Sequence, residues 1–400
     1  MRILIANDQH WPMVSGVATA TRALARGLAA RGHEVLVIAP SQTGRRYEEM
    51  DGNYRIIRTR SVPIPFRQNL RIAIELQNEF KKILETFQPD IVHVHTQLTV
   101  GLTALRMARK LGIPVVATNH VMPENILDNL KILLPLARPI NHIMKEYGIL
   151  LYKGAEHIVM PTQSAIDMFN LQGMDIPFTP MSNGIDLKEF KPGTVPKAFK
   201  QRFGLPLDKP IVTYLGRLDK EKHVSVLLRA MVHVRQQLDA HTLIVGQGND
   251  MDDLRELAKN LGLQAHVTFT GLVDEKDKPM IQRCATVYVM PSPAELQSLA
   301  TLEAMASGQP LVAVNAGALP ELCHDGKNGF LYDLDDDHQM ADKLLVILQD
   351  KTLRQRMSRE SVKIASRHDI EHVIDKFEEI YRDVIKQHAH QKEPLPTPVS

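Results

Sequence analysis

The chain has 400 residues, 44% of them hydrophobic and 24% charged, which is typical of a folded globular protein with more than one domain. A formal net charge of +2 gives no support to nucleic-acid binding, and only two cysteines, Cys284 and Cys323, argue against a disulfide framework. The first residues lead directly into a predicted strand and lack the apolar core and cleavage site of a signal peptide. No charge-free apolar run reaches the ~18 residues of a membrane span. We therefore expect a cytoplasmic protein.

The charge is unevenly divided along the chain. Residues 1–185 carry 20 basic against 15 acidic side chains, whereas residues 186–400 carry 28 against 31. This asymmetry predicts a mildly basic surface on the first half.

Short runs rich in β-branched residues alternate with helical patterns along most of the chain. In the first half we expect strands at Ile3–Ala6, Val35–Ala39, Ile91–His95, Pro114–Thr118, His157–Met160 and Phe178–Ser182. Helices are expected between them at Val17–Arg31, Leu70–Thr86 and Thr99–Leu111. The alternation restarts with strands at Ile211–Leu215, Thr242–Val245, Val267–Phe269, Val287–Met290 and Leu311–Val314. This order predicts an α/β fold with two doubly wound parallel sheets in tandem.

Proline and glycine mark the predicted boundary between two domains. We assign residues 1–185 to the first domain, 186–209 to a proline-containing linker and 210–370 to the second domain. An amphipathic helix is expected over 371–387, and the polar residues 388–400 are expected to form a disordered tail. In open parallel sheets, ligands bind beyond the carboxyl ends of the strands, so the loops at those ends are the candidate site.

Two carboxylates eight residues apart follow the predicted strand Val287–Met290. Glu295 precedes a predicted helix, and Glu303 lies about two turns into it. The free N–H groups at the start of such a helix form a phosphate site. A diphosphate with hydroxyl-rich groups at both ends, such as a nucleotide sugar, suits this arrangement.

A charged segment, Gly216-Arg217-Leu218-Asp219-Lys220-Glu221-Lys222, follows the predicted strand Ile211–Leu215. Arginine can bind a pyrophosphate through two N–H groups, and lysine adds a point charge. Taken alone, the segment is better interpreted as a solvated turn. Together with Glu295 and Glu303, it favours a diphosphate site.

Two residues that follow strands of the first domain are further candidates. Gly16 lies at a predicted helix start, where a glycine lets the backbone approach a phosphate closely; an ordinary glycine at a helix start is the alternative. His120 follows Pro114–Thr118, where its imidazole can bond a sugar hydroxyl or orient an acceptor. A loop histidine bonded to nearby backbone is an equally supported interpretation.

Other kinds of site receive little support. His93 and His95 share one face of a strand, but no further ligand lies at metal-binding spacing, so we expect no metal. Gly246-Gln247-Gly248 lacks the third glycine and the downstream acid of a dinucleotide fingerprint. No Gly-x-Ser-x-Gly segment is present.

Two stretches of the first domain bear on an acceptor. Between Gly52 and Ala73 an apolar, proline-containing loop is surrounded by five arginines and no acid: Arg55, Arg58, Arg60, Arg67 and Arg71. Such a segment can bind anionic headgroups while its apolar tip inserts into a membrane; a solvated basic face is equally consistent. Ile126–Tyr152 is rich in Leu and Ile, and ordinary core packing is favoured over a lipid groove.

Taken together and in order, these motifs resemble those of the retaining glycosyltransferases of family 4. The resemblance rests on the segments already described and on Arg31-Gly32-His33-Glu34-Val35, Pro89-Asp90-Ile91-Val92-His93-Val94-His95 and Ser182-Asn183-Gly184-Ile185-Asp186. It covers about residues 1–380. It implies the GT-B fold, with two Rossmann-like domains, a metal-independent active site between them and a last helix that crosses back to the first domain.

The resemblance implies how the donor diphosphate is held. Arg217 and Lys222 would bind it, with help from Gly16 and from the N–H groups near Ser298 and Leu299. The family usually has two adjacent glycines where this chain has a serine before Gly16.

Roles for four other residues are implied in the same way. Glu303 would bind the ribose hydroxyls, and Val273 would contact the base through its backbone. Glu295 would bind the donor sugar, and His120 would lie beside its O6 and the acceptor.

Two further segments, Thr118–Asn125 and Ala294–Ser298, look most like those of diacylglycerol glucosyltransferases and related glycolipid mannosyltransferases. The resemblance implies a retaining enzyme, peripheral on the inner face of the cell membrane, that moves glucose from UDP-glucose to a lipid hydroxyl such as that of diacylglycerol without a cofactor. The alternative is a GDP-mannose-dependent mannosyltransferase acting on a glycolipid or a soluble sugar. A nucleotide-sugar epimerase and a non-catalytic nucleotide-sugar sensor receive less support. The sequence does not define the oligomeric state.

Overall fold

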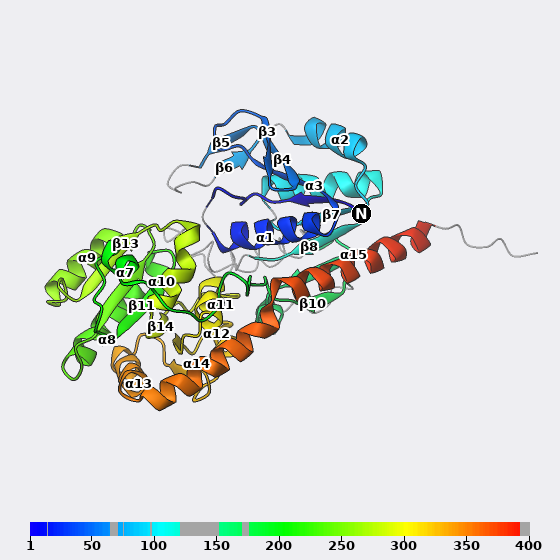
Figure 1. Ribbon diagram of the computed structural model, residues 1–400. Helices are drawn as coiled ribbons and strands as arrows, with labels where there is room; N and C mark the ends of the chain where they lie inside the picture. The colour runs from blue at the N-terminus through cyan, green and yellow to red at the C-terminus, as the bar shows by residue number, and fades with distance from the viewer. Residues whose placement is uncertain are drawn as a thin grey trace, which may run out of the picture. The chain divides into compact units, whose positions relative to one another are not determined.

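The structure is a computed structural model that describes residues 1–13, 15–64, 71–74, 76–96, 98–120, 152–169 and 176–392. The chain divides into two compact units. Unit 1 consists of Met1–Asn183 and Ile370–Ser400, and unit 2 consists of Gly184–Asp369. Each unit is built around one sheet flanked by helices (Figure 1).

Unit 1 contains a sheet with the strand order β10-β9-β8-β7-β1-β2-β4-β3. The strands are β1 (Arg2–Ala6), β2 (Glu34–Pro40), β3 (Tyr47–Asp51), β4 (Tyr54–Thr59), β7 (Ile91–Val94), β8 (Val115–Thr118), β9 (His157–Met160) and β10 (Phe178–Pro180). Neighbouring strands pair in parallel, except that β3 and β4 form an antiparallel hairpin at one edge. A separate antiparallel ribbon is formed by β5 (Ser61–Pro63) and β6 (Arg71–Ala73).

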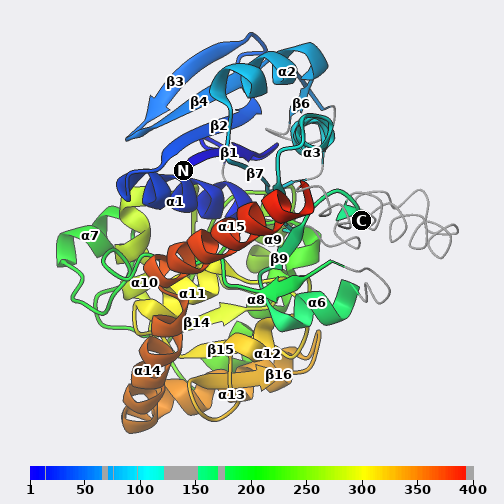
Figure 2. The ribbon, with the colours of Figure 1, turned by 90° about the vertical axis from the view of Figure 1, so that its right-hand side faces the viewer.

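The described helices of unit 1 are α1 (Gly16–Ala30), α2 (Leu76–Phe87), α3 (Thr99–Leu111), α6 (Gln163–Phe169) and α15 (Ile370–Lys392). Helices α1 and α15 lie side by side, although they come from opposite ends of the chain (Figures 1 and 2). Apolar side chains of α15, such as Ile374 and Phe377, join the core that α1 and the sheet form. Arg31 adds ion pairs to three carboxylates of α15, those of Glu371, Asp375 and Glu378.

Unit 2 contains an all-parallel sheet with the strand order β13-β12-β11-β14-β15-β16. The strands are β11 (Ile211–Leu215), β12 (His241–Val245), β13 (Val267–Gly271), β14 (Val287–Met290), β15 (Leu311–Val314) and β16 (Gly329–Tyr332). The helices are α7 (Lys197–Arg202), α8 (Val224–Arg235), α9 (Met251–Asn260), α10 (Lys278–Cys284), α11 (Leu299–Ala306), α12 (Leu319–Leu322), α13 (Asp337–Gln349) and α14 (Lys351–Ala365). Helix α8 packs against α9 and α13, whereas α11 packs against α10 and α14.

The predicted α/β fold with two parallel sheets is confirmed, and its strands lie within a few residues of the expected positions. The helix predicted over Leu70–Thr86 is wrong at its start, because Arg71–Ala73 forms strand β6 and helix α2 begins at Leu76. The hairpin β3–β4 and the edge strand β16 were not expected from the sequence.

The predicted boundaries differ from the two units in three places. The first segment of unit 1 ends at Asn183 rather than at residue 185, and residues 186–209 are part of unit 2 and contain α7, so they do not form a separate linker. The last helix begins at Ile370 and continues to Lys392, five residues beyond the predicted end, so residues 388–392 are helical. Residues 393–400 lie outside the described part of the chain. No helix in that part is long and apolar enough to cross a membrane.

Candidate functional site

The sheet of unit 2 has a topological switch point between β11 and β14. These strands are neighbours, but the chain continues from β11 to β12 on one side and from β14 to β15 on the other. Ligands of open parallel sheets bind at the carboxyl end of such a point. The segment Gly216–Lys222 follows β11, and the loop containing Glu295 follows β14. Most of the predicted donor-binding residues therefore come from the loops that flank the switch point or from α11, which follows one of these loops.

Lys222 and Glu295 are in direct contact across these two loops. The ammonium Nζ of Lys222 donates to Glu295 Oε1 at 2.8 Å and to Ser292 Oγ at 3.3 Å. The side chains of Lys222 and Glu295 are only 12% and 15% exposed, so solvent screens the pair less than it would a surface pair. The contact holds the lysine at the end of β14, where the sequence predicted a diphosphate.

Arg217 lies in the same segment, and its guanidinium pairs with the carboxylates of Asp219 and Glu221. Burial acts to lower the pKa of Arg217, but the two carboxylates outweigh this effect and the pKa lies above its ordinary value. Both cations predicted to bind a diphosphate therefore already have acidic partners within unit 2. An incoming diphosphate must compete with these carboxylates or share the cations with them.

Helix α11 begins where the loop after β14 ends. Ser298 is its N-cap, and its Oγ accepts a hydrogen bond from Thr301 N at 3.3 Å. The N–H groups of the first helical turn, which includes Leu299, have no partner within the helix and make its start a suitable place for an anion. Ser298 and Leu299, whose N–H groups were predicted to help hold the diphosphate, thus lie at the start of a helix.

Glu303 is buried in the middle of α11. Burial raises the pKa of Glu303 to about 7, and the positive charge of Lys278 offsets this rise only in part. Lys278 begins α10 and bonds Glu275 at 2.8 Å; burial acts to lower its pKa, but Glu303 and Glu275 raise it above the ordinary value. We did not anticipate Lys278 from the sequence, because it stands in a run of charged residues that reads as a solvated loop. The remaining predicted residue of this unit, Val273, lies after β13, partly buried against the core.

The segment after β11 is fixed by buried hydroxyl groups and by close backbone packing. Tyr214 donates its hydroxyl to the carbonyl of Arg217 at 2.7 Å, and Tyr288 donates to that of Leu215 at 3.0 Å. Gly248 packs so closely that a Cβ atom there would lie 2.3 Å from the carbonyl oxygen of Leu218. The glycines after β12, which do not match a dinucleotide fingerprint, therefore support the neighbouring loop.

In unit 1, the corresponding switch point lies between β1 and β7, and it is occupied by a side chain. Asp8, buried after β1, accepts hydrogen bonds from Val100 N at 2.8 Å and from Gly101 N at 3.2 Å at the start of α3. Burial raises the pKa of Asp8, and these bonds oppose the rise. The carboxylate thus takes the place that an anionic ligand would occupy at this helix. Gly16, the predicted phosphate-binding glycine, is the first residue of α1 and is exposed.

His120 is partly buried and lies against two buried histidines of unit 1, His95 and His93. Its Nε2 lies 3.0 Å from Nδ1 of His95, and the two rings stack with their centroids 5.3 Å apart. The ring of His93 is tilted by 40° against that of His95, with the centroids 3.9 Å apart, and His93 is hydrogen-bonded to Tyr381 and Thr118. Burial lowers the pKa of His120 to about 4, so the ring is neutral at pH 7 and can donate or accept a hydrogen bond without carrying charge.

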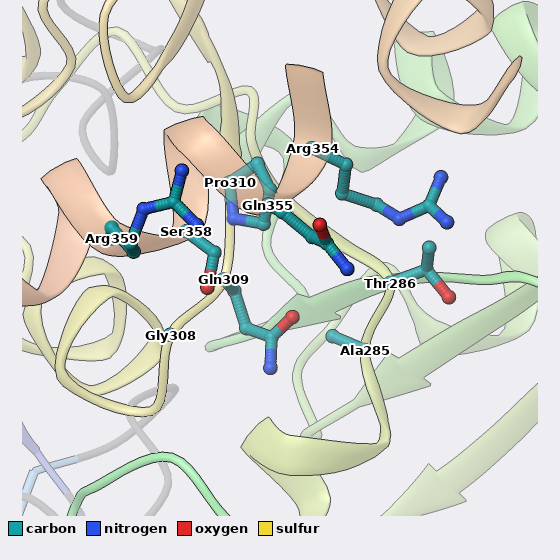
Figure 3. A pocket seen from close by; sticks show the side chains of 9 residues that line it. All are labelled: Ala285, Thr286, Gly308, Gln309, Pro310, Arg354, Gln355, Ser358 and Arg359. Atoms are coloured by element: carbon teal, nitrogen blue, oxygen red, sulfur yellow. The ribbon is translucent and has the colours of Figure 1, made fainter. Parts of the chain in front are cut away.

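Cavities are present in both units, among the described residues. A cavity of about 10 Å³ next to His120, also lined by His95 and Asn183, has room for about one water molecule. A larger one of about 540 Å³ lies in unit 2, where Arg354 and Arg359 stand at opposite sides of Gln309 (Figure 3). It is next to the residues that precede β14 and β15, so it lies at the amino ends of these strands and away from Lys222.

The basic segment of unit 1 is only partly available to a ligand. The prediction for Arg58 is wrong: its side chain is fully buried, and its guanidinium bonds Glu49 at 2.7 Å and the carbonyl of Trp11. Arg71 donates to Ser61 in the neighbouring strand, whereas Arg55 is 48% exposed and Arg60 is exposed. Arg67 and residues 126–151 lie outside the described part of the chain. Within that part, no group of three or more metal-ligating side chains is found.

Two family models match the chain. The model described as "Glycosyltransferase Family 4" matches residues 14–189, and the model "Glycosyl transferases group 1" matches residues 196–363. The first match contains Gly16 and His120, and the second contains all the site residues described in unit 2.

Curated relatives extend over most of the chain. An alpha-monoglucosyldiacylglycerol synthase of Streptococcus pneumoniae is 28% identical, with 87% of this chain and 78% of the relative covered. A GDP-mannose-dependent alpha-mannosyltransferase of Corynebacterium glutamicum is 29% identical, with coverage of 84% and 78%. A phosphatidyl-myo-inositol mannosyltransferase of Mycolicibacterium smegmatis is also 29% identical, with coverage of 88% and 86%.

Solved structures agree on the fold. Sucrose-phosphate synthase from Thermosynechococcus elongatus superposes with a TM-score of 0.78 at 19% identity, covering 97% of this chain and all of that one. Anabaena HepE in complex with UDP-glucose superposes with a TM-score of 0.75 at 21% identity, covering 96% of this chain and all of that one. Together with the two family models, these likenesses establish that the chain is a glycosyltransferase of family 4 with the GT-B fold.

Proposed function

We propose that this glycosyltransferase moves a hexose, glucose from UDP-glucose, to the hydroxyl group of a membrane lipid such as diacylglycerol, with retention of the anomeric configuration and without a metal ion. The observation that carries the proposal is the pairing of Lys222 with Glu295 at the switch point of unit 2, beside the start of α11. A cation, a carboxylate and a helix N-terminus at one sheet edge match the two halves of a nucleotide sugar. Lys222 and the helix suit the diphosphate, and Glu295 suits the hydroxyl groups of the sugar.

In this proposal the charge of the departing diphosphate is stabilised by groups that are already in place. As the glycosidic bond breaks, negative charge grows on the diphosphate, and Lys222, Arg217 and the N–H groups at the start of α11 stabilise it. The diphosphate oxygen accepts the proton of the attacking hydroxyl on the same face of the sugar, which gives retention. Glu303 binds the ribose hydroxyls, and the backbone of Val273 contacts the base.

The donor site is proposed in unit 2 because the equivalent place in unit 1 is filled. Asp8 already accepts the N–H groups at the start of α3, so a phosphate there would meet a carboxylate. For unit 1 we propose that Gly16 helps to bind the donor phosphates and that neutral His120 bonds a hydroxyl group of the donor sugar or the acceptor.

The proposed lipid acceptor is supported by the names of the S. pneumoniae synthase and the M. smegmatis mannosyltransferase, which both specify a lipid. The ribbon β5–β6 supports it as well. Val62 and Ile72 are paired across this ribbon and remain 43% and 38% exposed. Two exposed arginines, Arg55 and Arg60, lie on or next to β4, which precedes the ribbon. An apolar pair near exposed cations suits the surface of an anionic membrane, so we propose peripheral binding at the inner face of the cell membrane.

GDP-mannose is the second candidate donor. It is favoured by the C. glutamicum relative, whose name specifies a GDP-mannose-dependent enzyme with an identity close to that of the synthase. The acceptor would then be a glycolipid or a soluble sugar.

A donor panel tests the proposal directly. The purified chain is incubated with UDP-glucose, UDP-galactose, GDP-mannose or ADP-glucose, together with diacylglycerol vesicles, phosphatidylinositol vesicles or soluble sugars, in EDTA. We expect an α-glucosyl diacylglycerol, identified by mass and by the anomeric NMR coupling. A mannosylated product would support the second candidate, and a β-linked product or loss of activity in EDTA would contradict retention or metal independence. Flotation with and without anionic lipid checks the membrane proposal, which fails if the protein does not float.

A further inference from the structure

Two residues other than glycine adopt a left-handed backbone in unit 2 and touch each other. His223 has φ 49° and Asp335 has φ 63°. Nδ1 of His223 lies 2.6 Å from Oδ1 of Asp335, and since the carboxylate can only accept, this nitrogen donates. Left-handed residues other than glycine are uncommon, and they persist where the surrounding structure holds them in place. That two of them share one hydrogen bond indicates a contact that holds both loops.

The contact lies next to the proposed diphosphate site. His223 directly follows Lys222, at the point where the short 3-10 helix Lys220–Lys222 ends and α8 begins. The backbone angles of His223 therefore set the orientation of the turn that carries Lys222 relative to the start of α8. Asp335 lies in the turn between β16 and α13, and α13 packs against α8. The hydrogen bond thus joins the segments that directly precede the amino-terminal ends of α8 and α13.

We propose that His223 and Asp335 act as positioning residues for Lys222. The hydrogen bond keeps His223 in its left-handed conformation, and this holds the turn so that the Lys222 ammonium stays within reach of Glu295 and of a donor diphosphate. The inference rests on the proposed function, since it acts through the lysine to which that function assigns the diphosphate. The side chain of His223 is 28% exposed and that of Asp335 is 56% exposed, so the pair adds little to the stability of the fold. Its proposed effect is on the position of Lys222.

Substitutions to glycine separate the contact from the backbone strain. Asp335→Gly and His223→Gly both allow a left-handed backbone without strain, but each removes the hydrogen bond. Asp335→Asn keeps an acceptor oxygen on a residue that tolerates the left-handed region. Asp333→Gly, in the same turn but bonded to Gln339, is the matched control.

Binding of UDP and GDP to the full chain is measured by calorimetry, and transfer by kcat and KM, with thermal unfolding as a check on folding. We expect Asp335→Gly and His223→Gly each to weaken nucleotide binding by about tenfold, which corresponds to 1.4 kcal/mol. The double variant should lose no more than either single variant, and Asp335→Asn and Asp333→Gly should bind as the unchanged chain does.

The Lys222→Ala background separates this inference from the proposed function. If the pair acts through Lys222, adding Asp335→Gly to Lys222→Ala causes no further loss of nucleotide binding. A full additional loss in that background, or unchanged binding by Asp335→Gly alone, overturns the inference and leaves the proposed function standing. Unchanged binding and transfer by Lys222→Ala itself would overturn both.

Discussion

The ammonium of Lys222 and the carboxylate of Glu295 lie 2.8 Å apart, although 73 residues separate them in the chain. The group proposed to bind the diphosphate therefore contacts the group proposed to bind the sugar. The lysine cannot gain a phosphate partner without changing its interaction with the carboxylate, so the affinities for the two parts of a donor are linked.

Replacing Glu295 by glutamine should strengthen the binding of a free nucleoside diphosphate. The neutral amide keeps the size of the side chain but removes a negative charge that competes for Lys222. We expect UDP or GDP to bind roughly three- to tenfold more tightly, as for the loss of ~1 kcal/mol of competing attraction, while sugar transfer falls. Calorimetry and initial rates check the two effects. Asp253→Asn is the control, because Asp253 pairs with the exposed Lys220 at 3.4 Å; weaker nucleotide binding by Glu295→Gln would contradict the prediction.

Replacing Lys222 by alanine should lower kcat strongly. The variant loses a cation that stabilises the growing charge on the leaving diphosphate, an effect worth about 10²–10³ in kcat for comparable groups. Circular dichroism and thermal unfolding show whether the fold is kept. Lys220→Ala removes a lysine two residues away whose side chain is 71% exposed, and it should retain nearly full activity. Equal activity of the two variants would rule out the assigned role.

Donor binding should depend on pH through Glu303. Its pKa of about 7 means that it is partly protonated at neutral pH, and the ionised carboxylate accepts hydrogen bonds from ribose hydroxyls more strongly than the protonated form does. Nucleotide affinity should therefore rise as the pH increases from 6 to 8, and Glu303→Gln should bind more weakly and without this dependence. Calorimetric titrations at several pH values check this; a pH dependence that survives in the variant would assign it to another group.

The same carboxyl group should affect stability in the opposite direction. Its pKa in the folded chain lies above the ordinary value of 4.5, so the folded state holds the proton more tightly than the unfolded state does, and this contribution to stability is lost as the pH rises through 7. Relative to Glu303→Gln, the unchanged chain should lose about 3 kcal/mol of unfolding free energy between pH 4.5 and pH 8. Chemical denaturation of both proteins at the two pH values measures the difference. A constant difference would contradict the raised pKa.

Replacing Arg58 by alanine should destabilise unit 1 and have no direct effect on membrane binding. The buried guanidinium bonds Glu49 and the Trp11 carbonyl, and its loss should cost about 2–3 kcal/mol. The exposed Arg55 is the matched control: Arg55→Ala should change stability by less than about 0.5 kcal/mol and weaken flotation with anionic vesicles. Denaturation and flotation measure both effects. Loss of flotation only in the Arg58 variant, at unchanged stability, would reverse the assignment.

The parallel sheets could be predicted because their strands are buried on both faces. Val287–Met290 is a continuous apolar run, Ile211–Leu215 is apolar except for Thr213, and the structure places both strands at these positions. Strand β16, Gly329–Tyr332, lies at the edge of its sheet, where Phe330 and Leu331 are only partly buried, and its apolar run is just three residues long after a glycine. The burial of Arg58 could have been predicted from the alternation of side chains in β4, because Arg58 shares a face with Tyr54 and Ile56, which are both buried. Its charge alone suggested an exposed position.

The site could be predicted only as far as the strand ends. Lys222 and Glu295 follow strands that a doubly wound sheet places together, so their common location follows from the sequence. Their contact, the pairing of Arg217 with Asp219, and the bond between His223 and Asp335 depend on loop conformations. Those conformations are set by packing between segments distant in the chain, and no local pattern encodes them.

Helix α15 completes the core of unit 1 only after all of unit 2 has been synthesised. During synthesis on the ribosome, the apolar face beside α1 therefore stays uncovered while the next 186 residues, those of unit 2, are made. An early stop within unit 2 therefore leaves a folded-looking first half with an unfinished core, which is a substrate for chaperones and proteases. Packing of the last helix is therefore the step that completes the core of unit 1.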